Sequence, residues 1–271
     1  MPDIAAIVLA AGEGTRLRPL TSLRPKALCP VGNIPMLDRA LDLLAEVGIA
    51  GPDQVAVNAC WLADQIVEHA AGRAHLSVET ELLGSAGSVG RLHDWVAGRP
   101  VLVLNADAYF SGDVQLKELI EGWSGDRLRM LGQHHVGGPG EFGAFDFAGM
   151  SLMPAAAAAA LPAERSDLVH AVWRPAEAAG RLDVVSLHGL YLDCGTPTSY
   201  LFANLLEVED TLIAEDAVVT GEVTRSVVGA GAQVHGDIHD SVIWPGSTVA
   251  EGEHLYRVIR AGAQTIQVPL V

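Results

Sequence analysis

The sequence predicts an α/β protein, in which a doubly wound, mostly parallel Rossmann-like sheet is followed by a short left-handed β-helix of hexapeptide repeats. Short apolar runs, such as 4–11, 55–58 and 101–104, alternate with segments of helical periodicity. Strands that alternate with helices pair in parallel and are covered by helices on both faces. After residue 211 the helical periodicity ends, and Val or Ile recurs at spacings near five or six among small residues, which is typical of a stacked solenoid.

This change of pattern divides the chain of 271 residues into two predicted domains, residues 1–210 and residues 211–271. A chain of this length accommodates one large domain and a smaller one. In the second domain, segments such as 227–236 (VVGAGAQVHG) and 242–249 (VIWPGSTV) place small and β-branched residues toward the interior of about three coils. We expect this short β-helix to act as a cap or as the contact between subunits of a homo-oligomer.

Each element of the first domain follows from a local pattern. Residues 31–48 repeat apolar side chains at helical spacing up to Gly48, which is a natural helix end. The alanine run at 155–160 is helical by propensity, and the glycine-rich residues 134–143 predict a loop over the site. The other predicted elements are helices at 62–71, 116–123, 167–174 and 200–208, a helix that follows residues 84–88 and runs through Val96, and strands at 76–80, 128–133, 145–152, 182–187 and 190–192.

Composition limits the class of protein and the kind of partner. Charged residues are 18% and hydrophobic residues 49% of the chain, which indicates a compact globular protein. The net charge of −16 argues against nucleic acid and anionic lipid as partners. No apolar run reaches the ~20 residues that a membrane span requires, and the N-terminus lacks the basic start of a signal peptide. We therefore expect no membrane partner.

The few cysteines and lysines are informative as well. Cys29, Cys60 and Cys194 show no metal-ligand spacing, which fits reduced thiols in the cytoplasm. Lys26 and Lys117 are the two lysines of the chain. In so acidic a protein, an anionic substrate needs a local pocket of positive charge or a divalent metal ion.

The most informative stretch is residues 9–26, which begins LAAGEGTRLRPLT and ends with RPK. An apolar strand stops at Gly12, and both Gly12 and Gly14 can adopt positive φ and turn backbone N–H groups toward open space. Arg16 and Lys26 then supply fixed positive charge. The pattern is neither a Walker A loop nor the Gly-x-Gly-x-x-Gly dinucleotide fingerprint. A strand, a glycine loop and two cations together predict a site for a polyphosphate.

These residues resemble the signature of the sugar-1-phosphate nucleotidyltransferases, which reads LA(A/G)GxGTRLxPLT and is followed by Pro-Lys. With its C-terminal β-helix, the chain is similar to the mannose-1-phosphate guanylyltransferases of that family. The resemblance implies an enzyme, an NDP-sugar pyrophosphorylase, in which a sugar 1-phosphate attacks the α-phosphorus of a nucleoside triphosphate and pyrophosphate leaves. It also implies that Arg16 is the catalytic arginine at the leaving phosphates and that Lys26 acts at the α-phosphate.

The same resemblance assigns nucleotide binding to the glycine loop and to two later segments. The expected residues are Leu9, Ala10, Ala11, Gly12, Gly14, Thr15, Glu79, Gly84 and Ser85. Members that read uracil or thymine typically carry glutamine where this chain has Glu79. A carboxylate only accepts hydrogen bonds, whereas guanine offers two adjacent donors and uracil one donor between two carbonyl groups. Glu79 therefore favours GTP, unless it is an exposed strand residue and Glu81 is the residue that matters.

Two carboxylates at predicted strand ends suit a magnesium ion. Asp107 ends an Asn-Ala-Asp segment that resembles the family's Asn-Gly-Asp, and Asp193 lies in LDCGTP, which resembles Asp-x-Gly-Thr-Pro. Mg²⁺ prefers one or two carboxylates together with phosphate oxygens and water, so this pair predicts a metal cofactor. Either aspartate alone could be a strand-end cap or a turn residue. Ala106, in place of the family's glycine, is expected to narrow the approach of the sugar.

The sugar-phosphate side of the predicted site is less complete. The family usually has a second lysine, in a Glu-Lys-Pro segment, that binds the sugar phosphate, but no lysine follows Lys117 in this chain. The candidates for this role are Asn105, Gly143, Arg24 and Arg174, with His134 and His135 as further options.

Three alternatives stay open. The chain could use UTP or dTTP with another sugar 1-phosphate, such as that of a heptose, glucose or N-acetylmuramate. It could instead be a regulatory subunit that binds a nucleotide-sugar without catalysis, which the missing lysine supports and the retained Arg16, Lys26, Asp107 and Asp193 oppose. Acyl transfer on the β-helix would need more coils and a placed histidine. The sequence does not determine the sugar, the oligomeric state or the pathway.

Overall fold

The computed structural model describes residues 3–269, so the first two and last two residues of the predicted domains lie outside the described residues. By its contacts the chain forms two compact units. The first comprises Met1–Glu13 and Leu37–Tyr191, and the second comprises Gly14–Met36 and Leu192–Val271. The contacts therefore group the segment after the glycine loop with the C-terminal part. The domain boundary predicted between residues 210 and 211 stays a prediction.

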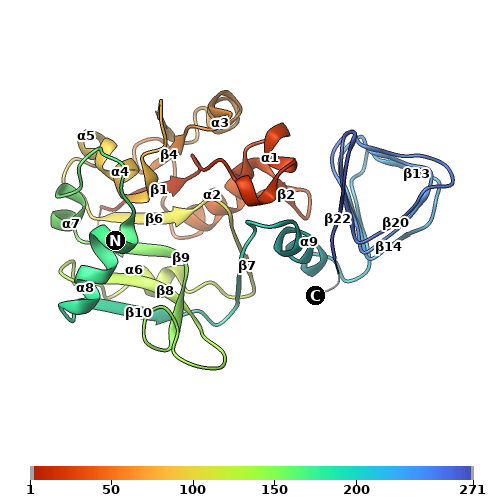
Figure 1. Ribbon diagram of the computed structural model, residues 1–271. Coiled ribbons are helices and arrows are strands. Elements are labelled where there is room, and N and C mark those ends of the chain that lie inside the picture. The colour runs from red at the N-terminus through yellow and green to blue at the C-terminus, as the bar shows by residue number, and fades with distance from the viewer. Residues whose placement is uncertain (1–2, 270–271) are drawn as a thin grey trace. The chain divides into compact units, whose positions relative to one another are not determined.

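The first unit is built on a seven-stranded sheet with the order β10-β8-β9-β6-β1-β4-β5 (Figure 1). Strands β5, β4, β1 and β6 run parallel, β10 and β8 are parallel to each other, and β9 is antiparallel to both β6 and β8. The predicted, mostly parallel α/β sheet is thus confirmed. Its strands are β1 (Ala5–Leu9), β4 (Val55–Ala59), β5 (His75–Val78), β6 (Val101–Asn105), β8 (Leu128–His134), β9 (Phe145–Met153) and β10 (Leu182–Ser186).

The helices of this part of the chain follow the prediction with local exceptions. The helix predicted to follow residues 84–88 already begins at Gly84, and it is interrupted at Leu92, whose φ of −89° and ψ of 10° are not helical. A π-helical turn, Val169–Trp173, replaces most of the helix predicted at 167–174, and strand β7 (Ala108–Ser111) was not predicted. The helices are α2 (Met36–Glu46), α3 (Ala63–Ala70), α4 (Gly84–Arg91), α5 (His93–Val96), α6 (Leu116–Ile120), α7 (Ala155–Ala159) and α8 (Arg174–Ala178).

One apolar cluster holds several of these elements on one face of the sheet. Ile7 of β1 and Val103 of β6 belong to it, together with Val89 of α4, Val96 of α5 and Trp173 of the π-helical turn. Each aliphatic side chain of this size stabilises the fold by roughly 1.5–3 kcal/mol when it is fully buried. The cluster therefore fixes the carboxyl ends of β1 and β6, which is where ligands bind in open α/β sheets.

The second unit contains two short segments before its repeats. The segment Gly14–Met36 includes the turns η1 (Thr15–Leu17) and η2 (Lys26–Leu28), the single-turn helix α1 (Leu20–Leu23), and a hairpin of β2 (Pro30–Val31) and β3 (Ile34–Pro35). Strand β11 (Leu190–Asp193) enters this unit at Leu192, and helix α9 (Pro197–Leu206) follows it.

The repeats then form three sheets, which Figure 1 shows as the sides of a triangle. Leu212 pairs with Val227 and Val227 pairs with Val242, so the first coils take 15 residues, whereas Val242 pairs with Ile259 and the next coil takes 17. Each of these coils is shorter than three hexapeptides. Val228, Val234 and other aliphatic residues fill the interior. The predicted β-helix is confirmed, and its handedness stays a prediction.

The strands of the β-helix are short. The first sheet contains β12 (Leu212–Ile213), β15 (Val227–Val228), β18 (Val242–Ile243), β21 (Val258–Ala261) and the antiparallel β22 (Gln264–Gln267). The second contains β13 (Val218–Val219), β16 (Gln233–Val234) and β19 (Thr248–Val249), and the third contains β14 (Val223–Thr224), β17 (Asp237–His239) and β20 (His254–Tyr256).

Candidate functional site

A pocket of about 370 Å³ lies in the first unit at the carboxyl ends of β1 and β6. It is the position that the parallel sheet predicts for a ligand. Several of the predicted site residues line it, namely Leu9, Ala11, Gly12, Gly84, Ser85, Asn105 and Asp107. The pocket is also lined by Asn58, Leu82, Ser88 and Arg165, which the sequence did not single out.

A buried amide organises the start of the glycine loop. Asn58 Oδ1 accepts a hydrogen bond of 2.7 Å from the Ala10 N–H, and Asn58 Nδ2 donates to Glu79 Oε1 and Ser88 Oγ, each at 2.9 Å. The side chain of Asn58 thus links β1, β4 and α4 at the floor of the pocket. Ala10 is a predicted nucleotide-binding residue. Its backbone N–H, however, donates to the Asn58 side chain of the same protein.

Glu79 belongs to the same network. It is 4% exposed, and its Oε1 lies 2.7 Å from the Ser88 hydroxyl while its Oε2 accepts from the Leu83 N–H at 3.2 Å. The Glu79 carboxylate therefore accepts hydrogen bonds from three protein groups, and it holds the 79–83 turn in place. Glu79 is not among the residues that line the pocket. Its predicted role as reader of the base stays a prediction, and these contacts support a positioning role instead. Glu81 is exposed.

Helix α4 has a glycine stripe against which a later segment packs. A Cβ at Gly84, Gly87 or Gly90 would overlap backbone atoms of Ser166, Glu164 or Pro162, respectively. Hydrogen bonds add to this contact: the Ser166 N–H donates to the Leu83 carbonyl at 2.9 Å, and Ser85 Oγ accepts from the Leu168 N–H at 2.9 Å. Residues 162–168 are therefore fixed on the helix that forms one wall of the pocket.

This packing brings Arg165 to the pocket, although its side chain is exposed. Arg165 is the one cation among the residues that line this pocket. The sequence does mark this residue, because Arg165 is the single Lys or Arg between Arg129 and Arg174. Its place at the pocket depends on the contact of residues 162–168 with α4, a helix that is separated from them along the chain by strands β6 to β9.

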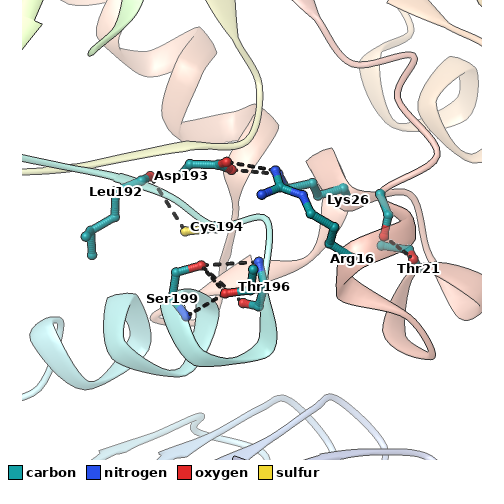
Figure 2. A network of polar contacts seen from close by, with 9 residues as sticks. Arg16, Thr21, Lys26, Leu192, Asp193, Cys194, Thr196 and Ser199 are labelled. Atoms are coloured by element: carbon teal, nitrogen blue, oxygen red, sulfur yellow. Dashed lines mark hydrogen bonds and ion pairs between the residues drawn. The ribbon is translucent and has the colours of Figure 1, made fainter. Parts of the chain in front are cut away.

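The predicted cations meet in the second unit (Figure 2). Lys26 Nζ donates to Asp193 Oδ1 at 2.9 Å, and Arg16 Nη2 donates to Asp193 Oδ2 at 3.0 Å. The Lys26 side chain is 10% exposed and that of Arg16 is 66% exposed. One carboxylate thus orients both of the residues that were predicted to be catalytic. We call Arg16, Lys26 and Asp193 the cation cluster.

Local backbone geometry explains two glycines of the motifs that carry this cluster. Gly14 has φ of +60°, and a Cβ there would lie 2.7 Å from Thr21 Cγ2. The Thr21 hydroxyl also donates to the Gly14 carbonyl at 2.9 Å, which closes the turn before Arg16. At Gly195, a Cβ would lie 2.6 Å from Arg16 Nη2 and 2.8 Å from Asp193 Oδ1. Gly14 needs glycine because of its positive φ and this close approach, whereas a side chain at position 195 would displace the Arg16 guanidinium from Asp193.

The electrostatics of Asp193 result from two opposing effects. Partial burial raises the pKa of this carboxyl, but the charges and hydrogen bonds of Lys26 and Arg16 outweigh that effect, and the pKa is lowered from its ordinary value. Three residues after Asp193, at Thr196, a capping box begins α9, in which the Ser199 N–H donates to Thr196 Oγ1 and the Thr196 N–H donates to Ser199 Oγ, each at 3.2 Å. Asp193 thus lies shortly before a well-capped helix start.

Other predicted residues have different surroundings. Arg24 lies over the Trp244 ring, with its guanidinium carbon 5.2 Å from the ring centroid. Arg174 donates to the Glu141 carbonyl at 2.8 Å and pairs with Glu177 at 2.7 Å. Neither arginine lines the pocket of the first unit. Their predicted contact with a sugar phosphate has no support from these contacts and stays a prediction.

The remaining predicted residues lie in a turn and in the loop between β8 and β9. Thr15 is exposed at the start of η1, and Gly143 has φ of +66° in the loop between β8 and β9. Next to that loop, His135 Nδ1 lies 2.7 Å from Asp146 Oδ2.

The two predicted metal ligands lie in different units, Asp107 in the pocket and Asp193 in the cation cluster. Among residues 3–269, no group of three or more His, Cys, Asp and Glu side chains could hold a metal ion. Mg²⁺ in nucleotide sites needs only one or two carboxylates, because phosphates and water supply the other oxygens. The donor chemistry of the two aspartates therefore fits this ion. No helix within residues 3–269 has the length and apolar character of a membrane span.

Comparisons with known proteins agree on the family. The model of the nucleotidyl transferase family matches residues 5–149. The chain is 37% identical over 126 residues to a mannose-1-phosphate guanyltransferase of Aspergillus oryzae, a match that covers 43% of this chain and 33% of that protein. It is 27% identical over 232 residues to an N-acetylmuramate alpha-1-phosphate uridylyltransferase of Caulobacter vibrioides, with coverage of 73% and 94%.

A solved structure supports the fold. A protein of Bacillus anthracis named as a candidate glucose-1-phosphate thymidylyltransferase superposes with a TM-score of 0.63 at 20% identity, and the match covers 76% of this chain and 96% of that one. The matches to the guanylyltransferases span about a third of those proteins, 30% to 34% of their length.

We expect Gly87→Ala to lower the free energy of unfolding by about 1–3 kcal/mol, because the added methyl group overlaps the Glu164 carbonyl. Urea denaturation measures this loss. Gly138→Ala is the control, since nothing lies within 4 Å of a Cβ at that position. Equal stability of Gly87→Ala and wild type would mean that residues 162–168 are not fixed on α4.

The cation cluster predicts a pH-dependent contribution to stability. Because the pKa of Asp193 is lowered in the folded state, its contribution is present above the ordinary carboxyl pKa of about 4 and is lost as the pH falls through the lower folded value. Asp193→Asn should therefore destabilise the protein more at pH 7 than at pH 3 in urea denaturation. Asp42→Asn, at an exposed position of α2, is the control. A deficit independent of pH would contradict the ion pairing.

Proposed function

Because this chain belongs to the nucleotidyl transferase family, we propose that it is a sugar-1-phosphate nucleotidyltransferase, which forms a nucleotide-sugar and pyrophosphate. The observation that carries this proposal is the convergence of Lys26 and Arg16 on the single carboxylate of Asp193. One guanidinium group and one ammonium group, both oriented by a carboxylate, suit the phosphates of a nucleoside triphosphate. The pocket beyond β1 and β6 lies at the position where open α/β sheets bind ligands, which also suits a nucleotide-binding protein.

In this reaction the protein must position the two substrates and neutralise the charge of the phosphates. An oxygen of the sugar 1-phosphate forms a bond to the α-phosphorus, the bond from that phosphorus to the bridging oxygen breaks, and pyrophosphate leaves with the electron pair. No covalent intermediate with the protein is required. Catalysis then comes from alignment of the two substrates and from fixed positive charge around the α-phosphoryl group.

Each member of the cation cluster has a part in this scheme. Lys26, as a mostly buried point charge, neutralises the α-phosphoryl oxygens as negative charge develops. Arg16 is more exposed, and its planar fork of donors suits the leaving β- and γ-phosphates. Asp193 keeps both cations oriented before substrate arrives, so little reorganisation is needed at the moment of reaction.

We propose Asp107 and Asp193 as ligands of Mg²⁺. The ion, when bound, would neutralise charge on the substrate phosphates. Arg165 would add the positive charge that the pocket otherwise lacks, and would partly compensate for the missing second lysine of the family.

For the substrates we propose GTP and a mannose 1-phosphate. The support comes from relatives named mannose-1-phosphate guanylyltransferases, which are 32% to 40% identical to this chain over their matched segments. The buried position of Glu79 removes much of the separate chemical argument for guanine. A second candidate pair is UTP with an N-acetylmuramate 1-phosphate, because the relative of that name matches 73% of this chain and 94% of its own length.

The test measures pyrophosphate release with each of four nucleoside triphosphates and a panel of sugar 1-phosphates, with and without Mg²⁺. We expect the highest turnover with GTP and mannose 1-phosphate in the presence of Mg²⁺. Lys26→Ala should reduce turnover by a factor on the order of 10²–10³ while its circular dichroism spectrum stays native. Preference for UTP with N-acetylmuramate 1-phosphate would select the second candidate. Nucleotide-sugar binding without turnover for any pair would refute the enzyme and support a regulatory subunit.

Arg165→Ala should lower kcat/KM for the preferred pair by roughly 10- to 100-fold, since a charge-assisted hydrogen bond contributes about 1.5–3 kcal/mol. Arg165→Lys, which keeps the charge, should recover part of this loss. Lys117→Ala is the matched control, because it removes one positive charge from an exposed position of α6 outside the pocket. An unchanged kcat/KM in Arg165→Ala would show that this side chain does not bind substrate.

A further inference from the structure

The segment that carries Arg16 and Lys26 is attached to the β-helix through a hydrogen-bonded chain of two buried aromatic residues. Trp244, at the end of a β-helix strand, is 5% exposed, and its Nε1–H donates to Tyr200 Oη at 2.9 Å. Tyr200, in α9, is fully buried, and its hydroxyl in turn donates to the Pro30 carbonyl. Pro30 follows Lys26 by four residues. The phenolic oxygen has one donor and one acceptor role, and both are used.

The same tryptophan contacts the chain on the other side of Lys26. The guanidinium of Arg24 lies over the Trp244 ring, 5.2 Å from its centroid. Such cation–π contacts contribute about 0.5–1 kcal/mol when exposed and about 2 kcal/mol when desolvated. A single β-helix side chain therefore holds the residue two before the lysine directly, and the residue four after it through Tyr200.

A second pair of contacts anchors the following hairpin. The Gly32 N–H donates to Asn204 Oδ1 of α9 at 3.0 Å, and Asn33 Nδ2 donates to the Val228 carbonyl of the first β-helix sheet at 2.9 Å. Asn33 has φ of +65°, a conformation that asparagine tolerates better than most residues. The segment from Arg24 to Asn33 is thus attached at four points to α9 and the β-helix.

The Lys26 turn itself has little freedom between these attachments. The Leu28 N–H donates to the Pro25 carbonyl at 2.9 Å and the Cys29 N–H to the Lys26 carbonyl at 3.0 Å. Cys29 is 0% exposed, and its thiol lies 3.6 Å from the Pro25 carbonyl. The ammonium group of Lys26 then reaches Asp193, which lies three residues before the N-cap of α9.

From these contacts we propose that Trp244 and Tyr200 are positioning residues for the nucleotidyl transfer, and that the β-helix supports the catalytic lysine. They act through Pro30 and Arg24 on the turn that presents Lys26. In-line phosphoryl transfer is sensitive to such support, because a displacement of about 1 Å in an aligned group can cost a factor of about 10² in rate. The inference rests on the proposed function for its kinetic part and on the contacts alone for its structural part.

The kinetic test compares Tyr200→Phe and Trp244→Phe with wild type. Tyr200→Phe removes the hydroxyl that holds Pro30, and kcat should fall about 10- to 100-fold while KM for the nucleoside triphosphate changes less than threefold. Trp244→Phe keeps a ring beneath Arg24 but removes the indole N–H, so its kcat should fall less. Val249→Ala is the control for general loss of stability, because Val249 is buried in the β-helix interior. Its kcat should stay at the wild-type value at temperatures where it is folded.

A double mutant separates positioning of Lys26 from general weakening of the fold. If Tyr200 acts through Lys26, then adding Tyr200→Phe to Lys26→Ala should change kcat by less than twofold. A further fall as large as that of Tyr200→Phe alone would overturn the positioning role, since independent effects multiply.

The thiol of Cys29 reports on the same attachment without any turnover. Burial raises the pKa of this thiol to about 12, so wild-type Cys29 should resist iodoacetamide at pH 8. In Tyr200→Phe, mass spectrometry should show at least tenfold faster alkylation of Cys29, with the partly exposed Cys60 as internal reference and Val249→Ala unchanged. Unaltered Cys29 labelling together with unaltered kcat would overturn the proposal. If the wild type turned over no substrate pair, the proposed function would fail while the labelling still decided the attachment.

Discussion

The arrangement of this protein depends on one carboxylate that holds two cations from a distant part of the chain. Asp193 pairs with Lys26 and Arg16, which precede it by 167 and 177 residues. A mostly buried ammonium group is costly unless it is paired, and removal of one partner of a buried pair leaves an uncompensated charge. In a chain of net charge −16 with two lysines, this pairing also concentrates scarce positive charge in one place. The approach of the backbone at Gly195 and the capped start of α9 are the local conditions that allow it.

In the first unit, a buried hydrogen-bond network shapes the pocket. Asn58 and Glu79 form a buried polar network in which each buried oxygen has a donor, and this network ties the glycine loop to β4, to the 79–83 turn and to α4. Fully satisfied networks of this kind favour one arrangement of the backbone, because any other leaves buried groups unpaired. The glycine stripe of α4 then admits the backbone of residues 162–166, which brings Arg165 to the pocket.

The parts of the fold that could be predicted are those set by short-range patterns. Apolar runs located β1, β4 and β6 to within a few residues, and the change of period near residue 211 located the β-helix. The interruption at Leu92 and the π-helical turn before α8 were missed, because they depend on how helices fit against their neighbours. The antiparallel direction of β9 was missed as well, since an apolar run carries no information on strand direction.

The sequence by itself determined the family, because the glycine loop, Arg16 and Lys26 follow one another within 18 residues in the order of the family's signature. It also determined that a β-helix follows. Only the tertiary structure decided which side chains meet. Asp193 lies with the two cations, Glu79 points into a buried network, and Arg165 reaches the pocket through a contact with α4. Trp244 and Tyr200 join the β-helix to the Lys26 turn. Asp193 and the cations, and Trp244, Tyr200 and Pro30, are far apart in sequence. A pattern along the chain does not show which of such distant residues come into contact.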